Sequence, residues 1–176
     1  MLYTGKGDDG TTSTFGCDQR LSKSSKIAEA LGTLDEINSF LGVVKTHQDA
    51  DETLSKKINS IQENLFIIQA QVAGADTVVA QGIVQEIEAA INAIEKELPP
   101  ITKFFISGGT PLAAHLDFAR TLARRAERRV VDVHEEKTVQ VHKETLVYLN
   151  RLSSLLYALA RFANHNAKII ENSPHY

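Results

Sequence analysis

The sequence has a single cysteine, Cys17, and no tryptophan among its 176 residues. One cysteine cannot form an internal disulfide, so we expect a protein of the reducing cytoplasm. The first ten residues, MLYTGKGDDG, lack the basic and then apolar stretches of a secretory signal. No apolar run approaches the roughly 20 residues of a membrane-spanning helix, so we expect no membrane association.

The sequence also lacks a strong charge of either sign, with a formal net charge of -3. This balance argues against a general nucleic-acid binder. Its six histidines show no metal-ligand spacing, and the Glu-x-x-His pairs of di-iron bundles are absent. The length and the hydrophobic content of 43% instead predict one globular domain with a sizeable core.

Apolar residues recur at steps of three and four over most of the chain, which predicts amphipathic helices. Five segments show this spacing: residues 27–44, 54–72, 84–98, 112–133 and 146–163. Thr110 is a suitable N-cap for the fourth helix, Pro111 suits its first position, and a polar connection over 134–142 should follow. We therefore predict an all-α fold, an up-and-down bundle of five helices over residues 26–176 with almost no strand. Residues 1–25 are rich in Gly, Thr, Ser, Lys and Asp. This composition predicts an extended or looped segment.

The fourth predicted helix carries a cluster of basic residues. Five arginines fall within ten residues: Arg120, Arg124, Arg125, Arg128 and Arg129. Three of them, Arg120, Arg124 and Arg128, follow one another at about one helical turn and so share a face. Such a row of fixed charge suits a polyphosphate. The alternative is a solvated face with Glu–Arg pairs, although the acids of this helix are too few to neutralise five arginines.

The N-terminal segment YTGKGDDGTTST, residues 3–14, has the composition of an anion-binding loop. Its glycines would let backbone N–H groups approach an anion, Lys6 adds charge, and the hydroxyls can donate hydrogen bonds. It is not a Walker A loop, because no Gly-Lys-Ser/Thr is present. The alternative for this segment is a flexible tail.

Two further polar sets lie beside the apolar stripes. Asp35 and Asn38 are one turn apart on the first helix. Either they form a buried polar pair that fixes helix register, or Asp35 is an acid that positions an arginine. Asn150 and Arg151 flank the apolar stripe of the last helix. They are candidates for chemistry, and the alternative is a capped or solvated polar edge of the helix.

Four segments together resemble the PduO-type ATP:cob(I)alamin adenosyltransferases. They are YTGKGDDGTTST, AEALGTLDEINSFLG, FFISGGTPLAAHLDFARTLARRAERRVV and LVYLNRLSSLLYALARFAN, which occur in the family's order between Tyr3 and Asn164. The sequence departs from the family's pattern at Ser107, where Pro is usual, at Asp9, where Lys is common, and in the local length near Cys17.

The resemblance implies a five-helix bundle that assembles as a homotrimer with active sites between subunits. The implied reaction transfers the 5′-deoxyadenosyl group of ATP to the cobalt of a reduced corrinoid, cob(I)alamin, which yields adenosylcobalamin and triphosphate. Mg²⁺ bound to ATP would share the phosphate charge. A flavin-type reductase and an adenosylcobalamin-dependent enzyme are implied as partners.

The resemblance also implies roles for individual residues, with catalytic ones for Asp35, Phe104, Arg120 and Arg124. Asp35 would pair with Arg120 of the next subunit, and Phe104 would displace the lower axial ligand of cobalt. The ATP contacts from one subunit would be Thr4, Gly5, Lys6, Gly7, Thr12, Ser13 and Lys23. Those from its neighbour would be Arg124, Glu127, Arg128 and Asn150. The alternatives are core packing for Phe104 or Phe105, a nucleotide-binding module without catalysis, and a structural trimer whose arginines form an interface.

Overall fold

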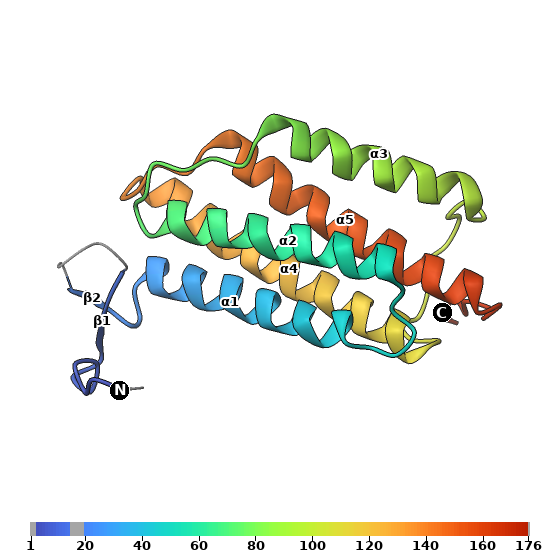
Figure 1. Cartoon of the computed structure of the whole chain (residues 1–176), viewed down its shortest axis with the longest axis horizontal. Helices are drawn as coiled ribbons and strands as arrows, with labels where there is room; N and C mark the ends of the chain where they lie inside the picture. The colour runs from blue at the N-terminus through green and yellow to red at the C-terminus, as the bar shows by residue number, and fades with distance from the viewer. Residues whose placement is uncertain (1–2, 15–19, 176) are drawn as a thin grey trace.

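The computed structural model describes residues 3–14 and 20–175, and these form a bundle of five helices with a short N-terminal hairpin (Figure 1). The helices are α1 (Lys26–Lys45), α2 (Glu52–Val72), α3 (Gln81–Glu97), α4 (Pro111–Glu136) and α5 (Lys143–Asn166). The predicted all-α bundle is therefore confirmed. Cys17 and the alignment around it lie outside the described residues.

Successive helices run in opposite directions along the long axis of the bundle, so α3 and α5 run the same way (Figure 1). α4 packs against both α1 and α5, while α2 covers α1 and α3 packs on α5. The loop from α3 to α4 crosses the end of the bundle at which α5 finishes. That loop carries Phe104, so the topology brings it beside the C-terminal half of α5.

The core follows the three-four spacing of the apolar residues. Leu34, Ile37 and Leu41 of α1 and Leu152 and Leu156 of α5 have no exposed surface. The buried face of α4 includes a run of small residues in its middle: Ala119, Ala123 and Ala126 are fully buried. Methyl side chains allow helix axes to approach closely, so α4 can lie near both of its neighbours.

The ends of α4 show which local signals the sequence carries. Thr110 Oγ1 accepts a hydrogen bond from the Ala113 N–H at 3.1 Å, and Pro111 occupies the first turn, as predicted. The C-terminal end lies at Glu136 rather than near Val133, so the predicted polar connection is shorter than expected. The polar residues after Val133 do not break a helix, so α4 continues past them. It stops where Lys137 adopts a left-handed conformation, with φ 58°.

The N-terminal segment contains a small antiparallel hairpin of β1 (Thr11–Ser13) and β2 (Arg20–Ser22). It projects from the end of the bundle at which α1 begins (Figure 1). At that end Lys26 Nζ lies 3.6 Å from Glu136 Oε1, an ion pair that links the start of α1 to the end of α4. Among the described residues, every helix is too short or too polar to cross a membrane.

Replacing Leu34 with alanine should lower the free energy of unfolding by about 2–5 kcal/mol, because it leaves a cavity at a fully buried position. Val43 lies on the same helix but is 48% exposed, so Val43→Ala should change it by only about 0.5 kcal/mol. Urea titrations of both variants measure the difference. Equal losses would contradict the assigned orientation of α1.

Candidate functional site

A cavity of about 380 Å³ opens between α4, α5 and the loop that joins α3 to α4. Phe104 comes from the loop, Arg120 and Arg124 come from α4, and Tyr157 comes from α5. The structure therefore brings together three of the residues that the sequence nominated. Phe104 is 80% exposed, so core packing is wrong for this residue. Phe105 is half-buried and lies under the guanidinium of Arg161, 5.1 Å from the ring centroid.

The turn before α4 is held by an asparagine of α5. Asn164 Nδ2 donates to the Gly108 carbonyl at 2.9 Å, and the Thr110 N–H donates to Asn164 Oδ1 at 3.0 Å. Gly109 has φ 100°, and a Cβ at this position would collide with the Asn164 carboxamide. Only glycine therefore fits here, and the Gly-Gly-Thr sequence places the loop and the N-terminus of α4 together.

The five arginines of α4 have different partners. Arg125 forms an ion pair with Glu36 of α1, and Arg129 Nε lies 3.3 Å from Glu29 Oε1 of the same helix. Arg124 and Arg128 are exposed, and neither forms a hydrogen bond or ion pair with any part of the chain that the structure describes. The solvated-pair interpretation thus fits two of the five arginines, Arg125 and Arg129, while Arg124 and Arg128 remain available for an anion.

Arg120 has a partner within its own helix. Its Nε donates to Asp117 Oδ1 at 2.6 Å, and its guanidinium lies 5.8 Å from the Tyr157 ring centroid. Asp117 is 8% exposed. Burial alone would raise the pKa of Asp117, but hydrogen bonds from Arg120 and Ser107 and the Arg120 charge outweigh it and hold this pKa below 3.8. Asp117 is therefore a carboxylate at neutral pH. The spacing of three residues was its only signal in the sequence.

Asp35 and Asn38 do not form a buried pair. Asp35 is exposed on α1 and makes no ion pair with residues 3–14 or 20–175. Asn38 is 5% exposed, and its backbone carbonyl accepts a hydrogen bond from Gln62 Nε2 at 3.0 Å. Asp35 is therefore free to meet a group outside this chain.

A hydrogen bond joins Glu127 of α4 to Asn150 of α5. Asn150 Nδ2 donates to Glu127 Oε1 at 2.9 Å, and Asn150 Oδ1 accepts from Arg151 at 2.8 Å. Arg151 Nε in turn lies 2.8 Å from Glu88 Oε1 of α3. The polar edge predicted for α5 is thus a chain of contacts, one turn along α4 from Arg124.

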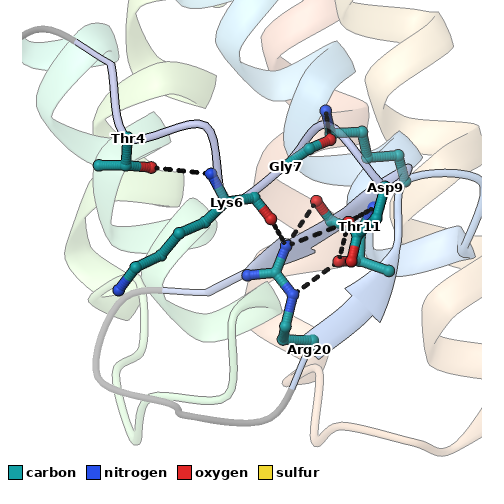
Figure 2. A network of polar contacts seen from close by, with 7 residues as sticks. Thr4, Lys6, Gly7, Asp9, Thr11 and Arg20 are labelled. Carbon is teal, nitrogen blue, oxygen red and sulfur yellow. Dashed lines mark hydrogen bonds and ion pairs between the residues drawn. The ribbon is translucent and has the colours of Figure 1, made fainter.

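The glycine-rich segment folds around Arg20, a residue that sequence reasoning missed (Figure 2). Arg20 Nε donates to Thr11 Oγ1 at 2.6 Å, and its terminal nitrogen donates to the carbonyls of Lys6 and Thr11. Asp9 Oδ1 accepts from Thr11 Oγ1 at 2.6 Å. The Lys6 side chain extends away from this network (Figure 2). No apolar period marks this segment, so no local pattern pointed to Arg20.

The residues nominated for ATP in the N-terminal segment lie on this hairpin and on the residues directly before and after it. Lys23 Nζ donates to the Gly7 carbonyl at 2.8 Å, and Thr4 Oγ1 accepts from the Lys6 N–H at 3.4 Å. A Cβ on Gly7 would lie 3.1 Å from Lys23 Nζ, so a larger residue would displace that lysine. Thr12 and Ser13 follow directly in β1.

The hairpin and the cavity are not adjacent within one chain. Arg124 precedes Glu136 by 12 residues in α4, which is about 18 Å along the helix. Glu136 is the residue that Lys26, next to the hairpin, reaches. The two sets of nominated ATP contacts are therefore at different places on the molecule.

No group of three or more His, Cys, Asp or Glu side chains that could hold a metal ion occurs in residues 3–14 and 20–175. The carboxylate of Asp9, next to the hairpin, is used in local hydrogen bonds with Thr11. A divalent cation at this site would have to arrive with its own oxygen ligands, as it does on a nucleotide triphosphate.

Comparisons with known proteins find sequence similarity to corrinoid adenosyltransferases. Residues 2–163 match the family model for cobalamin adenosyltransferase. The corrinoid adenosyltransferase PduO of Salmonella typhimurium is 40% identical over 96% of this chain and 52% of its own length. The corrinoid adenosyltransferase of Bacillus subtilis is 38% identical over 96% of this chain and 89% of its own length. The chain thus spans about half the length of the PduO relatives from Salmonella typhimurium and Citrobacter freundii.

Solved structures of a PduO-type ATP:corrinoid adenosyltransferase from Lactobacillus reuteri have the same fold. A phenylalanine-to-alanine variant complexed with cobalamin and ATP superposes with a TM-score of 0.91 at 31% identity, covering 100% of both chains. An arginine-to-lysine variant complexed with ATP gives a TM-score of 0.89 at 31% identity, covering 99% of this chain and 100% of its own.

Replacing Asp117 with asparagine should flatten the acid side of the stability curve. Because the pKa of Asp117 is lower in the folded state, its contribution is present above about pH 4 and is lost as the pH falls further. At neutral pH we expect the wild type to be more stable by about 1.5–3 kcal/mol, the usual range for a hydrogen bond to a charged group. Urea titrations from about pH 7 to pH 2 should show this difference shrinking. Parallel curves would contradict the assignment.

Proposed function

The chain belongs to the cobalamin adenosyltransferase family, and from this premise we propose that it transfers the 5′-deoxyadenosyl group of ATP to a reduced corrinoid. In this reaction Co(I) attacks the ribose 5′ carbon. The bond from that carbon to oxygen breaks, and triphosphate leaves with the electron pair. The observation that carries the proposal is an exposed aromatic ring, Phe104, in one cavity with the cations Arg120 and Arg124.

Arg124 and Arg128 would stabilise the leaving triphosphate. Negative charge grows on the departing oxygen, and fixed cations aimed at it lower the barrier. Both guanidinium groups are exposed and without a partner in the described chain, so no internal ion pair has to break first. Glu127 lies between Arg124 and Arg128 in α4 and is hydrogen-bonded to Asn150 of α5, so a carboxylate and an amide beside these arginines can orient the nucleoside. Mg²⁺ on ATP would neutralise part of the phosphate charge.

We propose that the protein is a homotrimer in which the hairpin of one subunit completes the cavity of its neighbour. The separation of the hairpin from Arg124, about 18 Å along α4, supports this. So does Asp35, an exposed acid that has no described partner. Asp117 uses only Nε of Arg120, which leaves the terminal nitrogens for a second carboxylate. Asp35 of one subunit would bind the partner's Arg120 there.

Phe104 would make the cobalt easier to reduce. An aromatic ring below the corrin excludes water and has no lone pair to offer, so a lower axial ligand is displaced and not replaced. The ring is presented rather than packed, since 80% of Phe104 is exposed while Phe105 is half-buried. A pure nucleotide-binding module has no need of such a ring.

The deciding experiment mixes the protein with ATP, Mg²⁺ and chemically reduced cobalamin. Loss of cob(I)alamin absorbance together with release of triphosphate would support the proposal. Binding of ATP without either signal would instead identify a nucleotide-binding module without catalysis. Failure to bind ATP would identify a structural assembly in which the arginines form an interface.

Arg124→Ala should lower kcat/KM for ATP by about 100- to 1,000-fold, the usual effect of removing one such donor. The free energy of unfolding should change by only about 0.5 kcal/mol, because Arg124 has no described partner. The matched control is Arg129→Ala, five residues later, whose guanidinium is used by Glu29. It should leave ATP use nearly intact. Equal loss of activity and stability in Arg124→Ala would mark a structural arginine.

Phe104→Ala should slow adenosylation that starts from cob(II)alamin and a reductant by about tenfold or more, roughly 1.4 kcal/mol of barrier. Supplied cob(I)alamin should still react, because the ring acts on reduction. Phe66→Ala, on an exposed ring of α2, is the control and should behave as the wild type. Full activity of Phe104→Ala from cob(II)alamin would rule out this role.

A further inference from the structure

The chain beyond α5 turns back onto the loop that carries Phe104. The Ile169 N–H donates to the Asn164 carbonyl at 2.9 Å, and the Ile106 N–H of the loop donates to the Asn172 carbonyl at 2.8 Å. The C-terminus lies beside this loop in Figure 1. The residues beyond α5 follow the part that the family model matches, which ends at residue 163. The roles assigned above leave this C-terminal tail, residues 167–175, without one.

Arg161 joins three segments at the cavity wall. Its Nε lies 3.0 Å from Glu171 Oε2 of the tail, and its terminal nitrogen donates to the Pro99 carbonyl at 3.2 Å. The same guanidinium covers the ring of Phe105. Arg161 is 6% exposed, and the Glu171 side chain is 18% exposed. A buried guanidinium has to be neutralised, and Glu171 is the carboxylate that does so.

We propose that Arg161 and Glu171 form a clamp that positions Phe104 toward the corrinoid, with Arg161 as a positioning residue. This inference rests on the proposed function. The clamp reaches the loop at Pro99 and Phe105 through Arg161, and at Ile106 through the tail. It therefore holds both sides of Phe104.

The clamp explains why two adjacent phenylalanines have opposite environments. Phe105 is turned inward by the guanidinium, because an arginine stacks favourably on an aromatic face. Phe104 is then left on the cavity side with 80% of its surface exposed. An exposed apolar ring gains nothing from water, so contacts of its neighbours have to keep it there. Ordering the loop in advance reduces the conformational entropy that ligand binding would otherwise have to lose.

The first test needs no turnover. In Glu171→Gln the charge that neutralises Arg161 is removed while the shape of the side chain is kept. The Ile106 amide, which is bonded to the tail, should then exchange its hydrogen about tenfold faster in the substrate-free protein. Ile170→Ala is the matched control, because Ile170 is in the same tail but 84% exposed. It should leave this exchange rate unchanged. An unchanged rate in Glu171→Gln would overturn the clamp.

The second test asks whether the clamp serves the corrinoid. Glu171→Gln should raise KM for the corrinoid about tenfold and leave KM for ATP unchanged, because Arg124 and Arg128 are not part of the clamp. Arg161→Lys should act in the same direction, since lysine keeps the charge but lacks the planar fork. Equal changes in both KM values would mean general destabilisation and would overturn the positioning role. If the wild type makes no adenosylcobalamin, the proposed function fails, and the exchange test still decides whether the clamp exists.

Discussion

The site depends on one constraint, the packing of α4 against two helices at once. α4 contacts both α1 and α5, and its buried face is lined by alanines at 119, 123 and 126. Because a methyl group keeps helix axes close, the long charged side chains of α4 are left to its edges. Arginines that are neighbours in sequence must therefore emerge on different sides. Those that face α1 meet acids, and the others line the cavity wall or stay exposed.

This geometry separates arginines that serve structure from arginines that serve binding. Ion pairs such as Arg125–Glu36 and Arg129–Glu29 are partly exposed, and pairs of that kind contribute only about 0–1 kcal/mol each. Their larger effect is to remove two of the five charges from the row. What remains near the cavity is a local excess of positive charge on a protein whose net charge is -3. Such a local excess attracts a polyanion, while the rest of the surface does not bind anions non-specifically.

The helices were predictable because packing repeats along the sequence, while the partners of charged side chains were not. The three-four spacing located all five helices, and Thr110 and Pro111 marked the start of α4. The Arg125–Glu36 pair joins residues 89 positions apart. Which acid an arginine meets depends on the rotation of both helices, and no local pattern encodes that rotation. Arg20 was missed for a related reason, since its partners are assembled only when the hairpin folds.

The hairpin and the cavity are each held in place by contacts within the chain, yet they lie at different places on the molecule. Arg20 holds the glycine-rich loop around its guanidinium, and Asp117 fixes the direction of Arg120 in the same way. These two sets of residues lie about 18 Å apart along α4, so within one chain they do not surround a common ligand. In the proposed trimer a neighbour supplies the second set. Activity and assembly are then linked by mass action, because each nucleotide bound between subunits also stabilises their contact.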